Sequence, residues 1–158
     1  MSRNIRGFPA PLGVVLGFVL AVSLAALSGC GSEPFSYVKV AGKVSYEDGS
    51  LIPAERVKVT FVSQAPPLDS KTNPPSGVAE VDPKTGSFNV VTSHTYGDGL
   101  VRGEHKVLIE ALNAEKLRSD LVPPEYTKAE TTPLLVKTDQ SPFDLKVRKP
   151  VAIKAEGK

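Results

Sequence analysis

The sequence predicts an all-β fold, a seven-stranded antiparallel Greek-key β-sandwich that follows an N-terminal signal helix. Beyond residue 36, apolar residues alternate with polar ones in short runs, which is the period of a half-buried strand. Segments rich in glycine, proline and aspartate separate these runs, and a single segment has helical character. Several short strands without helical periodicity are typical of a sandwich.

The first 29 residues have the order of a secretory signal peptide. Residues 1–6 are basic, residues 12–27 (LGVVLGFVLAVSLAAL) are apolar and uncharged, and small residues follow. The segment LSGC at 27–30 resembles the bacterial lipobox, whose cysteine is acylated on sulfur and becomes the mature N-terminus. The alternative is an uncleaved anchor in which Cys30, the only cysteine of the chain, is buried and inert.

We therefore expect a lipoprotein signal peptide over 1–29, a tether over 30–36 and a β-sandwich domain over 37–158. The lipobox resemblance implies several acyl chains on Cys30, and at about 0.8 kcal/mol per buried methylene two or more chains hold a protein stably on a membrane. It also implies that Gly31, rather than aspartate, after the cysteine favours the outer membrane. The expected location is the cell envelope, lipid-anchored at the outer membrane or another extracytoplasmic face.

The part of the chain after the leader is electrically neutral. Of the 19 basic residues, Arg3 and Arg6 lie in the leader, whereas all 17 acidic residues follow Cys30. No basic stripe interleaved with aromatic residues is present, so nucleic acid is excluded as a partner. A single cysteine allows no disulfide within the chain, and the remaining length suits one core. We expect a monomer.

The first strand is expected over 37–46. Its alternate residues are expected to face the core, whereas Lys39, Lys43 and Ser45 face the other way. The core-facing set is Val38, Val40, Gly42, Val44 and Tyr46. The Asp-Gly pair in 47–50 predicts a turn. The next strand is expected over 56–63, and its inward residues are Val57, Val59 and Phe61.

Residues 64–76 carry four prolines, which cannot donate to a ladder, and must form a loop. Short strands are expected at 77–82 and 87–92, joined by a tight connection at 82–87 that contains proline and glycine. The glycine-rich segment 93–103 is expected to be a second loop.

The strongest strand is predicted over 104–111. Its apolar face holds His105, Val107, Ile109 and Ala111. A connection over 112–132 follows, with a helix-like segment at 114–121 whose helical option ends at PPEY. Strands at 133–138 and 143–147 close the fold, with 151–154 as a ragged extension.

Four segments together are similar to one family. They are GKVSYEDGSLIPAERVKVTFV at 42–62, DPKTGSF at 82–88, GDGLVRGEHKVLIE at 97–110 and VPPEYTKAETTPLLVKT at 122–138. They resemble the small planctomycete lipoproteins that carry a carboxypeptidase regulatory-like, transthyretin-like domain. The resemblance covers residues 38–147 and implies a seven-stranded prealbumin-like, immunoglobulin-like sandwich, and most members of the family have no established activity. These motifs specify turns and core positions rather than a reaction.

No residue pattern indicates catalysis, a metal site or a cofactor. His94 and His105 are the only histidines and lack a partner at metal-ligand spacing, so His105 is interpreted as a ring at the core edge with a hydrogen-bonded nitrogen. Asp48, Asp82 and Asp98 lie beside or near glycines and are interpreted as turn formers rather than calcium ligands. The transthyretin-like 5-hydroxyisourate hydrolase ends in Tyr-Arg-Gly-Ser, a signature that this sequence lacks, so no catalytic residue is assigned.

The most promising surface is a pair of loops, 93–103 and 113–130, because function in sandwiches concentrates in loops held by a rigid scaffold. Tyr96 is the one tyrosine expected to offer an exposed aromatic platform, and Tyr96, Asp98 and Arg102 form the candidate binding loop. We expect a non-catalytic, lipid-anchored envelope binding or scaffolding module. Its partners would be the membrane, through lipidated Cys30, and an envelope protein or polysaccharide. The alternatives are a glycan-binding accessory domain and a divergent small-molecule hydrolase.

Replacing Cys30 with serine tests the anchor. Because acyl transfer needs the thiol, Cys30→Ser is expected to leave unprocessed precursor and to abolish incorporation of labelled fatty acid into the protein. The measurement is metabolic labelling followed by mass spectrometry of the N-terminus. An acylated Cys30→Ser protein, or a wild-type protein that retains residues 1–29, would contradict the lipoprotein hypothesis.

Overall fold

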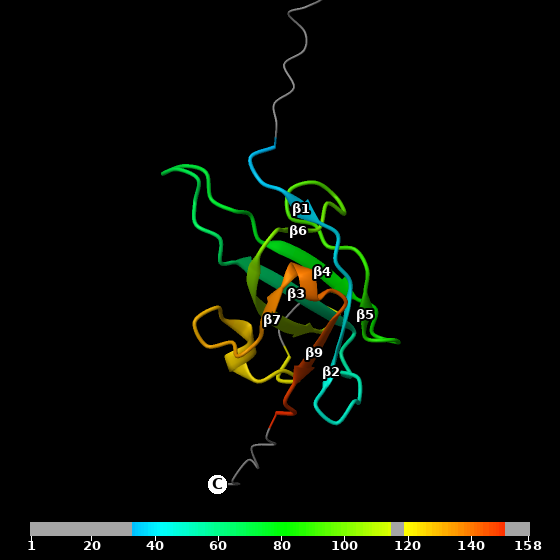
Figure 1. Cartoon of the computed structure of the whole chain (residues 1–158). Helices are drawn as coiled ribbons and strands as arrows, with labels where there is room; N and C mark the ends of the chain where they lie inside the picture. The colour runs from blue at the N-terminus through cyan, green and yellow to red at the C-terminus, as the bar shows by residue number, and fades with distance from the viewer. Residues whose placement is uncertain (1–32, 115–118, 151–158) are drawn as a thin grey trace, which may run out of the picture. The chain divides into compact units, whose positions relative to one another are not determined.

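The computed structural model describes residues 33–114 and 119–150, which belong almost entirely to the compact unit Pro34–Lys158 (Figure 1). These residues form β-strands and two short 3₁₀ helices and contain no α-helix, so the prediction of an all-β fold is confirmed. The leader with Cys30, residues 115–118 of the helix-like segment and the expected extension at 151–154 lie outside the described residues. The strands are β1 Tyr37–Val38, β2 Gly42–Tyr46, β3 Arg56–Ser63, β4 Gly77–Val81, β5 Ser87–Phe88, β6 Leu100–Val101, β7 Glu104–Leu112, β8 Leu135–Lys137 and β9 Phe143–Val147, and the 3₁₀ helices are η2 Pro124–Thr127 and η3 Thr138–Gln140.

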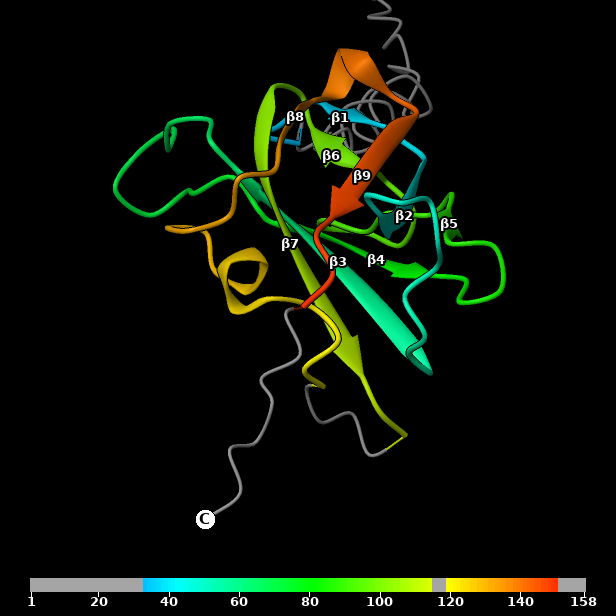
Figure 2. The ribbon, with the colours of Figure 1, turned by 90° about the horizontal axis from the view of Figure 1, so that it is seen from below.

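The strands form three sheets. A four-stranded sheet has the order β4-β3-β7-β8, a three-stranded sheet has the order β5-β2-β9, and β1 pairs with β6. The longest ladder joins β3 and β7 antiparallel from Arg56↔Leu112 to Ser63↔His105. The proline-rich loop 64–76 follows β3 as expected and extends away from the sheets (Figures 1 and 2).

Two parts of the predicted topology are wrong. β2 pairs with β9 in parallel, from Gly42↔Phe143 to Tyr46↔Val147, so the pairing is not purely antiparallel. The described residues form nine strands rather than seven, because the expected strand 37–46 divides into β1 and β2 and because β6 forms within the expected loop 93–103. β1 pairs with β6, whereas β2 pairs with β5 and β9, and residues 39–41 pass from one sheet to the next. The alternate residues of both β1 and β2 face the core, so the period-two pattern of the sequence does not reveal that the strand is interrupted at residues 39–41.

The two strands expected at 77–82 and 87–92 belong to different sheets and do not form a hairpin within one sheet. β4 belongs to the four-stranded sheet and β5 to the three-stranded sheet, and one bridge, Val78↔Thr92, is the only ladder pairing between the two segments. The tight connection between them is present: Gly86 has a φ of +74° and donates to the carbonyl oxygen of Asp82 at 2.7 Å. A Cβ at Gly86 would lie 2.6 Å from the carbonyl oxygen of Val44, so only glycine fits.

Further differences concern short segments. Leu100 and Val101 form β6 within the expected loop 93–103, because the backbone of β1 supplies their partners. The PPEY segment, expected to end a helix, itself contributes to η2, since a 3₁₀ turn accepts proline at its start. Ser45, placed on the outward face, is fully buried because the Lys146 side chain covers it and donates to Ser45 Oγ at 3.0 Å.

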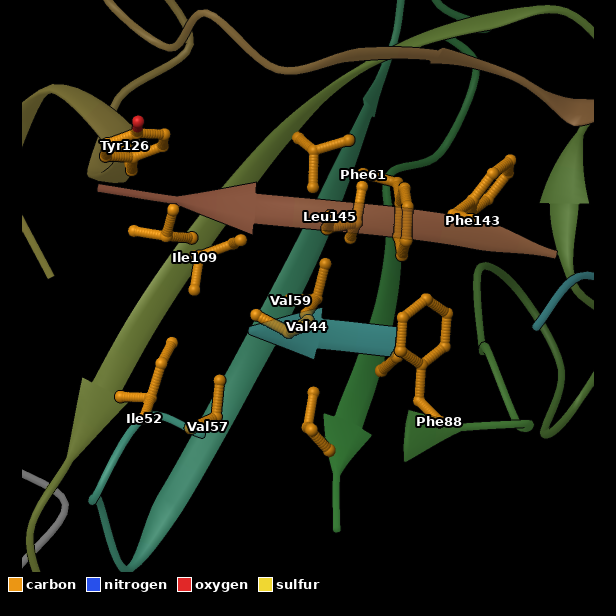
Figure 3. Close-up of a cluster of buried hydrophobic side chains, with 14 of the residues drawn as sticks. Val44, Ile52, Val57, Val59, Phe61, Phe88, Ile109, Tyr126, Phe143 and Leu145 are labelled. Carbon is orange, nitrogen blue, oxygen red and sulfur yellow. The ribbon is translucent and has the colours of Figure 1, made fainter. Parts of the chain in front are cut away.

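One hydrophobic core joins the two larger sheets (Figure 3). The predicted inward faces of β3 and β7 are confirmed, since every residue named for them is buried. Phe61 of β3 lies between the sheets, and its ring centroid is 5.8 Å from that of Phe88 on β5 and 5.8 Å from that of Phe143 on β9. The ring of His105 meets Phe61 edge-on at 6.5 Å. Phe61 therefore connects the two sheets through aromatic contacts.

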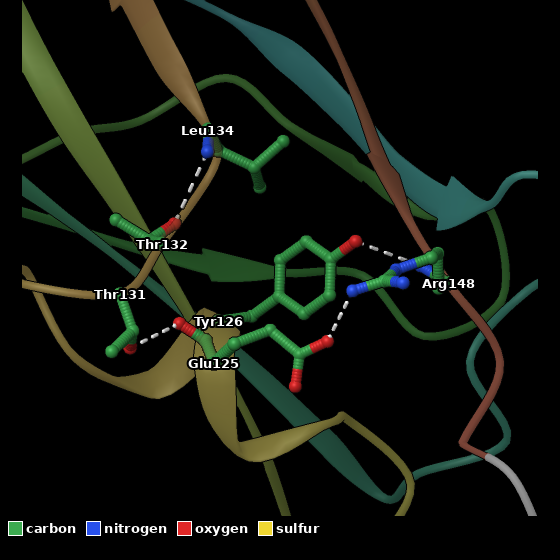
Figure 4. Close-up of polar contacts among 6 residues, drawn as sticks. All are labelled: Glu125, Tyr126, Thr131, Thr132, Leu134 and Arg148. Carbon is green, nitrogen blue, oxygen red and sulfur yellow. Dashed lines mark hydrogen bonds and ion pairs between the residues drawn. The ribbon is translucent and has the colours of Figure 1, made fainter.

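The segment around η2 is fixed to the core by Tyr126 (Figure 4). The Tyr126 ring is buried, and its hydroxyl accepts a hydrogen bond from the backbone N–H of Arg148 at 3.2 Å. The Arg148 guanidinium pairs with Glu125 at 2.6 Å, and Thr131 Oγ1 donates to the carbonyl oxygen of Glu125 at 2.8 Å. These contacts bind the end of β9 to the connection that follows β7.

Truncation of Phe61 tests the role of this ring. Phe61→Ala removes a fully buried ring with contacts in both sheets and is expected to lower the free energy of unfolding by about 3–5 kcal/mol. Leu68→Ala, at a side chain that is 58% exposed in the proline-rich loop, is the control and should change it by no more than about 0.5 kcal/mol. Urea unfolding followed by circular dichroism measures both. Equal effects of the two substitutions would show that Phe61 does not organise the core.

Candidate functional site

The clearest concave surface near a predicted site residue is a shallow groove with a volume of about 280 Å³. We call it the Tyr96 groove. Three separate segments line it: the link between β1 and β2, the residues after β5, and the loop before β6. Its main side chains come from Lys39, Val40, Asn89, Val90, Val91 and Tyr96. The volume is just below the range of about 300–1,000 Å³ that is typical of small-molecule sites.

Backbone hydrogen bonds hold the loop against the neighbouring segments. Gly99 donates to the carbonyl oxygen of Val91 at 3.0 Å, and Gly97 donates to Thr92 Oγ1 at 3.1 Å. Gly99 has a φ of +99°, and a Cβ there would lie 2.1 Å from the carbonyl oxygen of Val38. The loop can approach β1 this closely only because residue 99 is glycine.

Asp98 shapes the loop from within. Its Oδ1 accepts a hydrogen bond from the N–H of Ser93 at 2.8 Å, and its Oδ2 accepts from His94 at 2.8 Å and from Thr95 at 2.9 Å. Partial burial raises the pKa of Asp98, but the backbone donors outweigh this effect and leave the pKa below its usual range. The Asp98 carboxylate thus stabilises the loop by accepting its backbone hydrogen bonds, in agreement with the interpretation of Asp98 as a turn former.

Tyr96 is held at the groove with its side chain in water. It is 87% exposed, and the neighbouring Val90 is 39% exposed, so the groove offers an aromatic ring beside an apolar patch. Val40 and Val91 are buried beneath them and form an apolar floor. This combination of an apolar base and an exposed ring suits a ligand that has both an apolar face and polar edges.

The three residues of the candidate binding loop have different positions. Tyr96 lines the groove, Asp98 supports it, and Arg102 is exposed but outside the lining. Arg102 is tied to the tether side of the domain by its backbone N–H, which donates to the carbonyl oxygen of Ser36 at 2.8 Å. The structure adds Lys39 and Asn89, which the sequence gave no reason to group with Tyr96.

The two loops expected to form one surface do not come together. The loop 93–103 lies beside β1 and β6, whereas the described part of 113–130 lies around η2, at a different end of the domain (Figures 1 and 2). The second loop is used for packing: Tyr46 donates its hydroxyl proton to the carbonyl oxygen of Leu121 at 2.8 Å. The candidate site is therefore confined to the first loop and the segments beside it.

His105 is a core residue rather than one at the core edge. Its side chain is fully buried, Nε2 lies 2.7 Å from the carbonyl oxygen of Val101, and Nδ1 has no hydrogen-bond partner among the described residues. Burial lowers its pKa, and the hydrogen bond to Val101 only partly opposes this effect. A neutral, enclosed imidazole has no access to a substrate. Its role is to link β7 to β6.

Asp48 and Asp82 are likewise occupied with local structure. Asp48 accepts hydrogen bonds from Ser50 and pairs with Lys149, whose ammonium group holds the pKa of Asp48 well below its usual range. Asp82 Oδ1 accepts from the N–H of Lys84 at 2.9 Å. Within residues 33–114 and 119–150, no group of three or more histidines, cysteines or acidic residues could hold a metal ion. No helix in these ranges is long and apolar enough to cross a membrane.

Asp98→Asn tests how the loop is held. The substitution removes the charge and replaces one acceptor oxygen with an NH2 donor, so the three backbone hydrogen bonds are weakened or lost and the free energy of unfolding should fall by about 1–2 kcal/mol at pH 7. Because the pKa of Asp98 is lower in the folded than in the unfolded state, its contribution is complete above the ordinary value of about 3.9 and disappears as pH falls through the folded value. The wild type should therefore lose its advantage over Asp98→Asn below about pH 4.

The control is Asp139→Asn, at an exposed carboxylate that makes no hydrogen bond with the described residues. Thermal unfolding between pH 2 and 7 measures all three proteins. A constant difference between wild type and Asp98→Asn across this range would contradict the role given to the charge.

Comparisons of the chain with protein-family models, curated proteins and solved structures gave no match. Any function must therefore be inferred from the groove and its surroundings.

Proposed function

We propose that this chain is a non-catalytic binding module of the cell envelope that recognises polysaccharide at the Tyr96 groove. The observation that carries the proposal is the exposed Tyr96 ring, 87% accessible, beside an apolar patch and the amide of Asn89. The CH face of a sugar ring stacks on an aromatic ring, while its hydroxyl groups exchange hydrogen bonds with amides. The Tyr96 groove presents both kinds of partner.

The chemistry of the groove supports binding rather than catalysis. Its lining contains no carboxylate, histidine, serine or threonine, so it offers neither a nucleophile with an adjacent base nor an acid–base pair. The nearby carboxylate of Asp98 is occupied by backbone donors, and His105 is enclosed in the core. A divergent hydrolase would need a nucleophile with an adjacent base or an acid–base pair in reach of the ligand, and no histidine or carboxylate in the lining stands beside Lys39 or Tyr96 to form one.

The cellular location is proposed from the lipobox resemblance at 27–30. Lipidation of Cys30 would hold the folded domain close to a membrane, because only a few residues separate Cys30 from β1. We also propose, from the sequence resemblance, that the chain is a transthyretin-like β-sandwich lipoprotein. Two larger sheets around one core support this assignment.

Retention on immobilised polysaccharide tests the function. The full chain, kept in detergent micelles, is applied to purified envelope polysaccharides. Tyr96→Ala should weaken retention about tenfold, which corresponds to the loss of about 1.4 kcal/mol of stacking. Tyr96→Phe keeps the ring and should retain most of the affinity. Leu135→Ala, at an exposed apolar residue of β8 outside the groove, should have no effect.

Two results would contradict the proposal. If a polysaccharide is retained equally by wild type and Tyr96→Ala, the binding site lies elsewhere. If no envelope polysaccharide is retained by the wild type, the chain is not a glycan-binding module.

A further inference from the structure

We propose that the Tyr96 groove selects saccharides that carry an acidic group, and that Lys39 recognises this charge. This inference rests on the proposed function and adds the ligand class. The groove has a single charged lining residue, Lys39, which lies on the link between β1 and β2. Binding of a neutral sugar would not require an ammonium group at this position.

Lys39 has no ion pair within the described ranges, unlike three other lysines of the domain. Lys58, Lys146 and Lys149 pair with Glu110, Asp144 and Asp48. Lys39 is exposed and makes no such contact with residues 33–114 and 119–150. Its charge is therefore available to a ligand in the groove.

The surroundings of the groove do not neutralise this charge. No carboxylate lines it, and the acid on the same loop, Asp98, faces the N–H groups of Ser93, His94 and Thr95. The Asp98 carboxylate is thus directed to the backbone donors of its own loop, and Lys39, on the β1–β2 link, is the charged side chain that lines the groove. An anionic ligand is favoured because it meets an ammonium group without competition from a protein carboxylate.

The remaining polar atoms of the groove suit a sugar. The amide of Asn89 is exposed and makes no hydrogen bond with the described residues, so two donors and one acceptor are available. Tyr96 supplies the stacking surface, and Lys39 supplies the contact for a carboxylate or sulfate. The three groups define an acidic saccharide as the ligand that uses all of them.

Matched pairs of acidic and neutral oligosaccharides test the inference. Isothermal titration calorimetry on the full chain in neutral detergent compares oligogalacturonate with its methyl ester, and a sulfated glucan oligosaccharide with its unsulfated form. Of the two acidic saccharides, the one that binds more tightly should have an affinity about three- to tenfold higher than that of its neutral partner. Added salt should reduce this preference, because the contact is exposed to solvent.

Lys39→Gln removes the charge while keeping a polar side chain. It should abolish the preference for the acidic member and leave the affinity for the neutral member unchanged. Lys43→Gln, at an exposed lysine of β2 outside the groove, is the matched control and should retain the preference. Thermal unfolding verifies that both variants fold.

The outcomes separate the two proposals. If a neutral saccharide binds in a Tyr96-dependent manner as tightly as its acidic partner, the chain is a glycan-binding module but the inference about charge is wrong. If acidic saccharides are preferred but Lys39→Gln and Lys43→Gln reduce the preference equally, general surface charge accounts for it and Lys39 has no specific role. If neither member of either pair binds, both proposals are overturned.

Discussion

The position of Phe61 between two sheets is the constraint on which the rest of the domain depends. Its ring contacts Phe88 on β5, Phe143 on β9 and His105 on β7, so each of the two larger sheets contributes to one aromatic cluster. Phe88 is buried in this cluster, and its strand β5 pairs with β2 rather than with β4. The residues that follow Phe88, beginning with Asn89, line the groove. One segment therefore contributes both to the core and to the groove.

Much of the fold could be predicted from the sequence because β3 and β7 have one buried face each. Their alternation identifies the inward residues without any knowledge of the partner strand. The same pattern could not show that β1 and β2 are separate, because residues on both sides of the link face one core. It also could not show that β2 and β9 run parallel, since pairing direction depends on how distant segments meet in space. Ser45 is buried for the same reason, since the side chain that covers it lies far away in the sequence.

The site could be predicted in part. Tyr96 was identifiable because it lies in a glycine-rich segment outside any amphipathic strand, and Asp98 because aspartate beside glycine is a turn signal. Their different roles depend on the loop conformation, in which backbone N–H groups turn toward the carboxylate. Lys39 and Asn89 read as ordinary outward-facing residues, and only tertiary packing brings them beside Tyr96. Because three separate segments contribute to the site, no single segment has a sequence pattern that identifies it.

We propose that a preformed groove on the β frame receives an acidic saccharide. The most direct test of this proposal is to follow the amide chemical shifts of the ¹⁵N-labelled full chain during titration with an acidic oligosaccharide. If the saccharide binds in the Tyr96 groove, the largest changes should occur at Asn89, Val90, Tyr96 and Gly97, while the amides of β3 and β7 remain unchanged. Changes centred on the loop 64–76 or on η2, or no change at saturating saccharide, would contradict it.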